Sequence, residues 1–244
     1  MRLFLIRHGQ STNNVLYDIN TYETNRTHDP ELTAMGHQQA AHVAEFLTDA
    51  IDMPVPETEQ LQFTHLYVSP MRRALDTAKP IAEALHIQPE VWTDIHEIGG
   101  LFTTDKEGVD TAYPGMSRAE MSDCYPNYIL PDGIRDNGWW DVKRGRETRA
   151  EFLGRAIGVT MALRERAHTS DKIALVAHAA FFDVLLKAFL NQLPNHPLNL
   201  FYNHYNTGVS RLDFDESRWA RVDDHIRIHY LNRVTHLPPE LWTW

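Results

Sequence analysis

The chain has 244 residues, and its 33 acidic against 23 basic side chains give a formal net charge of −10 with the histidines taken as neutral. A nucleic-acid-binding surface needs a basic face to neutralise phosphates, which neither this balance nor the isoelectric point of about 5.7 offers. A hydrophobic content of 43% supports a substantial core and excludes an intrinsically disordered chain. Such an acidic protein can still bind a small anion in a local pocket.

The cysteine content and the amino terminus narrow the class of protein further. A single cysteine, Cys124, excludes an intramolecular disulfide and a cysteine-based zinc site. The first apolar run covers only residues 3–6, which is shorter than a signal-peptide core, and no apolar stretch approaches the roughly 18 residues of a membrane span. We therefore expect a soluble cytoplasmic protein with no membrane or nucleic-acid partner.

Short apolar runs predict the strands of the fold, and amphipathic runs between them predict its helices. Continuous apolar sequence suits strands buried on both faces, whereas alternation suits strands with one exposed face. The predicted strands cover residues 3–6, 66–68, 173–177, 209–214 and 226–230. The predicted helices are one capped by Thr33, one that starts at Ser69 and Pro70 and runs to residue 85, and two over residues 147–167 and 180–190.

This alternation of strands and helices predicts an α/β fold with a mostly parallel sheet flanked by helices on both faces, a three-layer α/β/α arrangement. The segment 99–145 breaks the alternation, since it is rich in Gly, Pro and aromatic residues and offers only one short helix near residues 117–123. It holds too little periodic apolar sequence to build its own core. We expect one domain over residues 1–244, with an insertion at about 99–145 over the active-site edge.

Two histidines and three arginines lie at or after the ends of the predicted strands. Arg7 and His8 end the first strand, His178 ends the strand at 173–177, and Arg72 and Arg73 begin the helix after the strand at 66–68. Ligands of open α/β sheets bind outside the carboxyl ends of the strands, and a helix start favours anions. The sequence therefore predicts a phosphate-sized positive pocket at this edge. Helical periodicity leaves open which of the two helix-start arginines faces it.

The residues at this edge resemble those of the histidine phosphatase superfamily, the phosphoglycerate mutase-like proteins. Arg7-His8-Gly9 resembles the family's signature, and further segments follow in the family's order over nearly the whole chain. These segments are Leu32-Thr33-x-x-Gly36-x-x-Gln39-Ala40, Ser69-x-x-x-Arg73-Ala74-x-x-Thr77-Ala78, Leu175-Val176-Ala177-His178 and Asn206-Thr207-Gly208-Val209. Five matches in order make the resemblance highly specific.

The resemblance implies a role for each catalytic residue. It implies that His8 attacks phosphorus and carries a phosphohistidine, that Arg73 and not Arg72 joins the phosphate clamp with Arg7 and His178, and that Glu97 donates the proton to the leaving alcohol. The remaining substrate-binding positions would be Gly9, Gln10, Ser11, Asn14 and Ala179. No metal and no cofactor is implied, and the substrate would be a small phosphorylated metabolite.

Two departures from the family's pattern bear on the activity. Ala179 stands where the family usually has Gly, which narrows the approach of the backbone to a phosphate. Glu97 lies in His-Glu-Ile-Gly-Gly and not in the sequence Glu-Arg-His-Tyr-Gly of the mutase branch. The resemblance thus favours a phosphomonoesterase acting through phospho-His8. The alternatives are a phosphoglycerate mutase-like phosphomutase and a catalytically idle relative that binds a phosphorylated ligand.

Several other features allow two interpretations each. The basic run at 143–149 is either a solvated helix start or an extension of the positive field toward a substrate with several phosphates. The aromatic residues of the insertion, Trp139 and Trp140 among them, either pack it onto the domain or form a lid. His225 and His229 fall on a predicted strand, which favours a structural role over metal ligation. The aromatic tail at 241–244 either packs on the body or forms the contact of a homodimer, and the loop at 191–206 is expected to affect substrate specificity.

Overall fold

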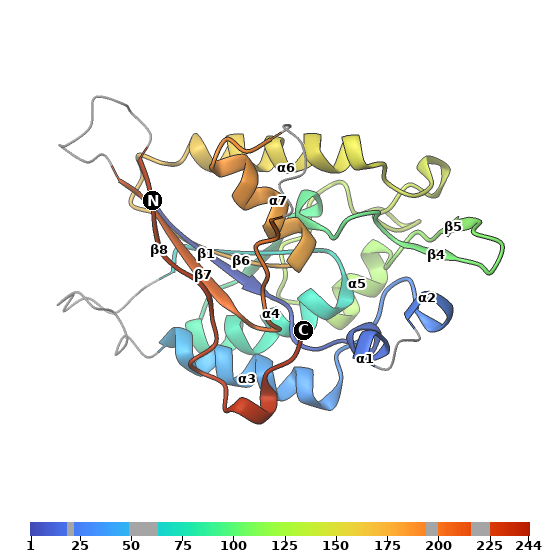
Figure 1. The fold of residues 1–244 in the computed structure, drawn as a ribbon, viewed down its shortest axis with the longest axis horizontal. Coiled ribbons are helices and arrows are strands. Elements are labelled where there is room, and N and C mark those ends of the chain that lie inside the picture. Colours follow the sequence, from blue (N-terminus) through green and yellow to red (C-terminus); the bar gives the residue numbers. More distant parts are fainter. Residues whose placement is uncertain (19–21, 49–62, 194–199, 216–224) are drawn as a thin grey trace.

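The computed structural model describes residues 1–18, 22–48, 63–193, 200–215 and 225–244. Its centre is a six-stranded sheet in the order β3-β2-β6-β1-β7-β8 (Figure 1). The strands are β1 (Arg2–Arg7), β2 (His65–Val68), β3 (Pro89–Val91), β6 (Lys172–Ala177), β7 (Val209–Asp215) and β8 (His225–Arg233). The first four of these pair in parallel, and β7 and β8 complete one side in antiparallel pairing. The prediction of a mostly parallel α/β sheet is confirmed.

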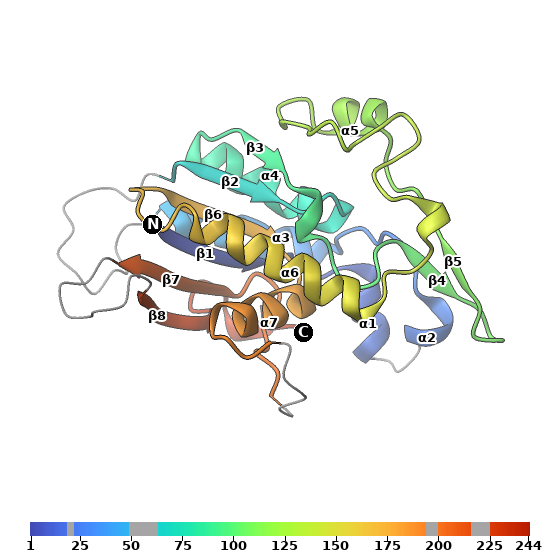
Figure 2. The same ribbon diagram turned by 90° about the horizontal axis from the view of Figure 1, so that it is seen from above.

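Two pairs of helices cover the two faces of the sheet (Figures 1 and 2). Helices α3 (Ala34–Thr48) and α4 (Arg72–Leu85) pack on one face, and α6 (Arg149–Arg164) and α7 (Ala179–Phe189) pack on the other. Successive side chains of a strand point to opposite faces, so that Phe4 and Ile6 join the core under α3 and α4, whereas Leu3 and Leu5 join the core under α6 and α7. This is why the run in β1 is apolar at every position.

The predicted helix caps are partly confirmed. Thr33 caps α3, since its Oγ1 accepts a hydrogen bond from the backbone N–H of Gly36. The prediction for Ser69 is wrong, because α4 begins at Arg72 with Met71 as an N-cap that makes no side-chain bond. Ser69 extends the strand instead, donating its backbone N–H to Val176, and its hydroxyl lies in hydrogen-bond contact with His178.

Short elements that carry no strong periodicity were not predicted. Helices α1 (Thr12–Asp18) and α2 (Tyr22–Asn25) follow β1, and a separate hairpin of β4 (Phe102–Thr104) and β5 (Asp110–Ala112) lies in the segment 99–145. The predicted short helix of that segment is present as α5 (Arg118–Cys124), and single 3-10 turns occur at Thr93–Ile95, Val142–Arg144 and Pro239–Leu241. In both ribbon views α1, α2 and the β4–β5 hairpin gather beyond the carboxyl ends of the parallel strands (Figures 1 and 2).

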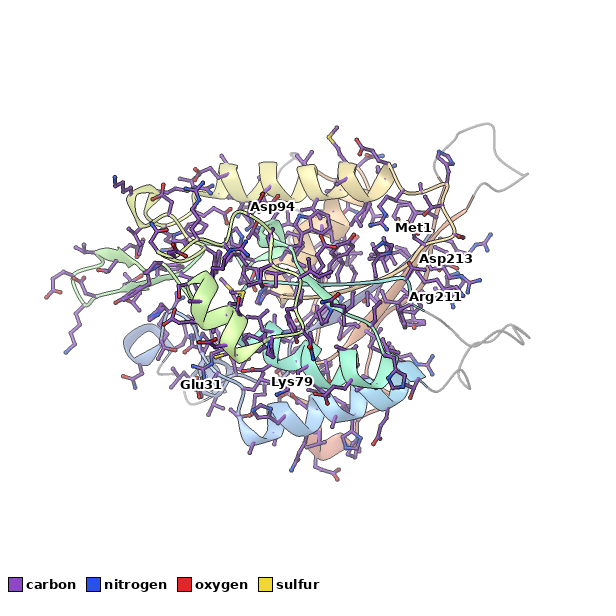
Figure 3. The ribbon with its side chains drawn as sticks, turned by 180° about the vertical axis from the view of Figure 1, so that it is seen from behind. Met1, Glu31, Lys79, Asp94, Arg211 and Asp213 are labelled. Carbon is purple, nitrogen blue, oxygen red and sulfur yellow. The ribbon has the colours of Figure 1, made fainter. Side chains whose placement is uncertain are left out.

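Charged residues of β7 and β8 interact with one another at the end of the sheet that lies away from α1 and α2. Figure 3 shows Met1, Arg211 and Asp213 together, far from Glu31. Arg211 donates from Nε and Nη2 to the two carboxylate oxygens of Asp213, and His229 Nε2 lies 3.0 Å from Asp213 Oδ2. His229 and His225 both belong to strand β8, so the strand predicted at this place is confirmed.

The aromatic residues of the insertion and of the tail pack against the body. Trp139 and Trp140 are buried, and both rings lie beside the ring of His96. In the tail, Trp244 stacks on Tyr205 with 3.8 Å between ring centroids. Packing onto the body is thus observed for Trp139 and Trp140 of the insertion, and in the tail Trp244 contacts the body while about half of its side chain stays exposed. Among the helices that the structure describes, none is long and apolar enough to cross a bilayer.

Candidate active site

His8 lies at the carboxyl end of β1 with both ring nitrogens engaged. Its Nδ1 is 2.7 Å from the backbone oxygen of Gly9, and its Nε2 is 3.1 Å from Nε of Arg73. The carbonyl oxygen can only accept and the guanidinium N–H can only donate, so Nδ1 must carry the proton and Nε2 the lone pair. The fold therefore presents Nε2 as the nucleophilic atom of a neutral imidazole.

Electrostatics hold His8 in this neutral form. Burial lowers the pKa of His8 well below its usual value near 6.5, and the positive charges of Arg73 and Arg7 lower it further. Burial also lowers the pKa of Arg7, to about 10, which leaves this side chain charged at neutral pH. Arg7 is held in place by donating Nη1–H to the backbone oxygen of His204 at 2.6 Å.

The two arginines at the start of α4 have different environments. Arg73 is buried against His8, whereas Arg72 is largely exposed and forms an ion pair with Glu31 at 2.7 Å. On the far side of Arg73, Asp29 Oδ1 lies 4.0 Å from its Nη1. Burial raises the pKa of Asp29 to about 6, although Arg73 opposes that shift. Helical periodicity could not select the arginine that faces the pocket. In the structure Arg73 faces it and Arg72 does not.

His178 lies directly after β6 and is fully buried beside His8, with 5.1 Å between the two ring centroids. Its Nε2 is 2.7 Å from the hydroxyl of Ser69. Its Nδ1 is buried and has no hydrogen-bond partner among the described residues. An unpartnered buried nitrogen costs free energy, which a ligand oxygen would relieve. Burial and the charge of Arg73 lower the pKa of His178 well below its usual value.

Glu97 belongs to the segment that follows β3, and its side chain lines the same cavity as His8. Its carboxylate accepts backbone hydrogen bonds from Ile98 at 2.9 Å, Phe181 at 3.1 Å and Ala180 at 3.3 Å. The last two donors belong to the first turn of α7, so the carboxylate sits at the positive end of that helix. The start of α7 thus positions both residues, since His178 is its N-cap residue and Glu97 accepts hydrogen bonds from its first turn.

A buried ion pair fixes the segment that carries Glu97. Arg155 donates from Nε and Nη2 to the two oxygens of Glu147, each at 2.8 Å, and from Nη1 to the backbone oxygens of Asp94 and His96. Glu147 in turn accepts from the backbone N–H of Gly99. The pair therefore clamps the chain on both sides of Glu97.

We expect Glu147→Gln to lower the free energy of unfolding by about 3 kcal/mol at pH 7, because it leaves a buried guanidinium without its counter-charge. Burial is the largest single influence and would raise the pKa of Glu147, but the hydrogen bonds and charges of Arg155 and His96 together outweigh it and hold that pKa at about 2. A lowered pKa stabilises the fold above the ordinary carboxyl range, near pH 4.5, and this contribution is lost as the pH falls toward 2.

Urea unfolding at several pH values measures this prediction, with Glu45→Gln, on the exposed side of α3, as the matched control. The difference between wild type and Glu147→Gln should be largest near pH 7 and shrink below pH 4.5. A difference that stays constant down to pH 2, or a loss no larger than that of the control, would contradict a charge-based role.

The signature glycines permit a close approach of two backbones. A side-chain carbon at Gly9 would stand 2.5 Å from the backbone oxygen of Gly36, and one at Gly36 would stand 2.2 Å from the backbone oxygen of Gln10. The side chain of Gln10 accepts from Thr33, and Gln10 does not line the cavity described below. The structure therefore places Gly9 and Gln10 in the packing of the signature loop against α3, and not at the substrate surface predicted for them.

Ser11 and Asn14 do line the cavity, together with Ala179. The backbone N–H and the hydroxyl of Ser11 both donate to Oδ1 of Asn14, at 2.9 and 2.8 Å. This arrangement uses the acceptor of the amide and leaves its NH₂ group for a ligand.

Of the residues described above, seven line one cavity of about 430 Å³, a size common for small-ligand sites: Arg7, His8, Ser11, Asn14, Arg73, Glu97 and Ala179. His178 is fully buried next to His8 and is not itself among the lining residues. The lining of the cavity includes four arginines and one carboxylate, Glu97, so that the cavity is strongly positive within an acidic protein. Sequence patterns had no signal for Arg26, which lies in a short stretch without periodicity, and only a weak one for Arg146, in the basic run. From the predicted loop at 191–206, Phe201 reaches the cavity, and residues 194–199 lie outside the described part.

Comparison with known proteins agrees with this geometry. The family description "Histidine phosphatase superfamily (branch 1)" matches residues 3–224. The uncharacterized phosphatase PhoE of Bacillus subtilis is 25% identical over 225 residues, which cover 92% of this chain and 94% of PhoE. Among solved structures, a mutant phosphoserine phosphatase from Entamoeba histolytica in complex with phosphoserine superposes with a TM-score of 0.59 at 21% identity, over 97% of this chain and 99% of the other.

A mycobacterial glucosyl-3-phosphoglycerate phosphatase superposes with a TM-score of 0.56 at 22% identity, over 96% of this chain and 99% of the other. The structural likenesses concern the fold, whereas the family match extends over most of the sequence. The chain belongs to the histidine phosphatase superfamily.

Proposed function

We propose that the protein is a phosphomonoesterase that hydrolyses a small phosphorylated metabolite through a phosphohistidine at His8. The observation that carries this proposal is the state of the imidazole, whose Nε2 bears a lone pair beside Arg73 in a positive cavity. The family membership and the phosphatase names of the relatives support it.

In the first step, the Nε2 lone pair of His8 forms a bond to phosphorus while the bond from phosphorus to the ester oxygen breaks. Arg7 and Arg73 neutralise the charge that spreads over the other three phosphoryl oxygens, and the neutral imidazole of His178 contributes a hydrogen bond from Nδ1–H, in support of which this nitrogen has no other partner among the described residues. Arg73 leaves its contact with Nε2 when phosphorus takes that position. Glu97 gives its proton to the departing alkoxide.

In the second step, a water molecule attacks the phosphohistidine and gives a proton to Glu97, which the first step left as a carboxylate. The nitrogen–phosphorus bond breaks, its electron pair returns to Nε2, and inorganic phosphate leaves. The segment 99–145 acts as the cap of this site, in support of which Gly100, Phe102 and Thr104 line the cavity.

Rapid-quench labelling tests the proposal. A ³²P-labelled alkyl phosphate should give a phosphoprotein that survives alkali but is lost in acid, as expected of a phosphohistidine, together with steady release of inorganic phosphate. Incubation with 3-phosphoglycerate, with and without a bisphosphate primer, distinguishes hydrolysis from transfer. Phosphate moved between hydroxyls without net release would identify a mutase, and the absence of both label and turnover over a broad substrate panel would leave only ligand binding.

A further inference from the structure

Two arginines of the cavity have no task in the phosphoryl transfer just described. Arg26 follows α2, and Arg146 lies between the turn at Val142–Arg144 and α6. Both line the cavity that contains His8. Because α2 and β4 lie side by side in both ribbon views, chain segments about 80 residues apart in sequence meet at the mouth of the site (Figures 1 and 2).

The ring of Phe102 organises these two arginines. The guanidinium carbon of Arg26 lies over this ring, 4.2 Å from its centroid, and that of Arg146 lies over it at 4.1 Å. The distance between the two guanidinium carbons is therefore at most the sum of these two distances. Stacking on an aromatic face stabilises each cation but does not neutralise it. The pair is a preorganised cationic cluster, referred to below as the Arg26–Phe102–Arg146 cluster.

Acidic partners compensate this cluster only in part. Arg146 forms an ion pair with Asp110 at 3.3 Å, which engages one of its five N–H groups. The buried Nε of Arg26 has no hydrogen-bond partner among the described residues. Arg26 also lies close enough to the phosphoryl clamp for its charge to contribute to the lowered pKa of Arg73. Two positive charges that stack on the same ring repel each other, and a second anionic group of a ligand would relieve this repulsion.

From this geometry we infer that the Arg26–Phe102–Arg146 cluster is a second anion subsite, and that the preferred substrate is a phosphate monoester carrying a second anionic group, a carboxylate or another phosphate. This inference rests on the proposed phosphatase function and specifies its substrate class. The planar guanidinium fork suits both kinds of oxygen anion. One ligand would then bridge Arg7 and Arg73 at the inner end of the cavity and Arg26 and Arg146 at its mouth.

The test uses three substrates that share a three-carbon chain and differ only at the far end. Propyl phosphate ends in a methyl group, 3-(phosphonooxy)propanoate in a carboxylate, and propane-1,3-diol bisphosphate in a second phosphate. We expect the wild-type kcat/KM to be at least about 10-fold higher for one or both of the doubly anionic compounds, which is the size of a charge-assisted contact. The two compounds distinguish a carboxylate site from a phosphate site.

Arg26→Gln and Arg146→Gln should each remove most of that preference, because each should lower kcat/KM far more for the doubly anionic compounds than for propyl phosphate. Arg149→Gln is the matched control, because Arg149 belongs to the same basic run but is not among the lining residues. Equal losses on all three substrates would show a general electrostatic or structural role and overturn the subsite. A wild type with no preference for either doubly anionic compound would also overturn it.

Calorimetric measurement of the affinity of the three compounds for the His8→Ala protein tests the subsite independently of hydrolysis. Tighter binding of a doubly anionic compound than of propyl phosphate, reduced by adding Arg26→Gln, would establish the subsite even if the wild type hydrolysed none of the three. Hydrolysis of propyl phosphate without any such difference in affinity would retain the phosphatase and reject the subsite.

Discussion

Replacing His8 by alanine should reduce phosphatase turnover by at least about 10,000-fold, the order of loss seen when a covalent nucleophile is removed from an enzyme. The physical reason is that Nε2 of His8 carries the lone pair beside Arg73, so that no other atom in this position can form the bond to phosphorus. Steady-state release of inorganic phosphate and acid-labile labelling measure the loss, and the label should disappear together with the turnover.

His37→Ala is the matched control, because His37 is exposed on α3. Thermal unfolding of both variants shows whether the fold is retained, and phosphate binding to the alanine protein shows whether the arginine clamp persists. A folded His8→Ala protein that kept more than a few per cent of wild-type turnover would exclude His8 as the nucleophile and with it the proposed mechanism.

Glu97→Gln should have an effect that depends on the leaving group. With propyl phosphate we expect kcat to fall by about 100- to 1,000-fold, because an alkoxide cannot depart without a proton. With p-nitrophenyl phosphate the loss of phosphoenzyme formation should be less than about 10-fold, because nitrophenolate is stable as an anion. Glutamine keeps one acceptor oxygen, which can still serve the two N–H groups that share Oε1, those of Ile98 and Phe181, so that only the longer bond from Ala180 to Oε2 is lost together with the proton donor.

Rapid-quench measurement of the first step isolates this effect from hydrolysis of the phosphoenzyme. Asp94→Asn is the control, since Asp94 is an exposed carboxylate three residues away (Figure 3). Equal losses of the first step on the two substrates would argue that Glu97 positions the site and does not donate the proton.

Strong local patterns account for the parts of the fold that could be predicted. The buried strands and long helices follow from apolar periodicity, and the placement of His8 and His178 at one edge follows from the parallel pairing of β1 and β6. The resemblance to the family added Arg73 and Glu97, which periodicity could not select. The short elements α1, α2, β4 and β5 were missed because three to seven residues give too few turns or alternations to detect.

Local patterns also misplaced some residues. Ser69 and Pro70 form a common helix start, yet α4 begins only at Arg72, and the hydroxyl of Ser69 instead contacts Nε2 of the buried His178. Gln10 lies within the signature but packs against α3 through Thr33. In both cases the side chain forms a hydrogen bond with a residue distant in sequence, His178 for Ser69 and Thr33 for Gln10, and not the interaction expected from its neighbours in the chain.

The sequence by itself determined the acidic character of the protein, the order of its main strands and helices, and the residue types of its chemistry, because these depend on composition and on short-range periodicity. Only the tertiary structure decided the tautomer of His8, the burial of Arg73 but not of Arg72, and the meeting of Arg26 and Arg146 over Phe102. These features join segments far apart in the chain, and no local pattern encodes a distance across the fold. A protein with a net negative charge can therefore contain a positive cavity. Composition gives only the number of arginines, whereas the fold brings four of them together in the lining of this cavity.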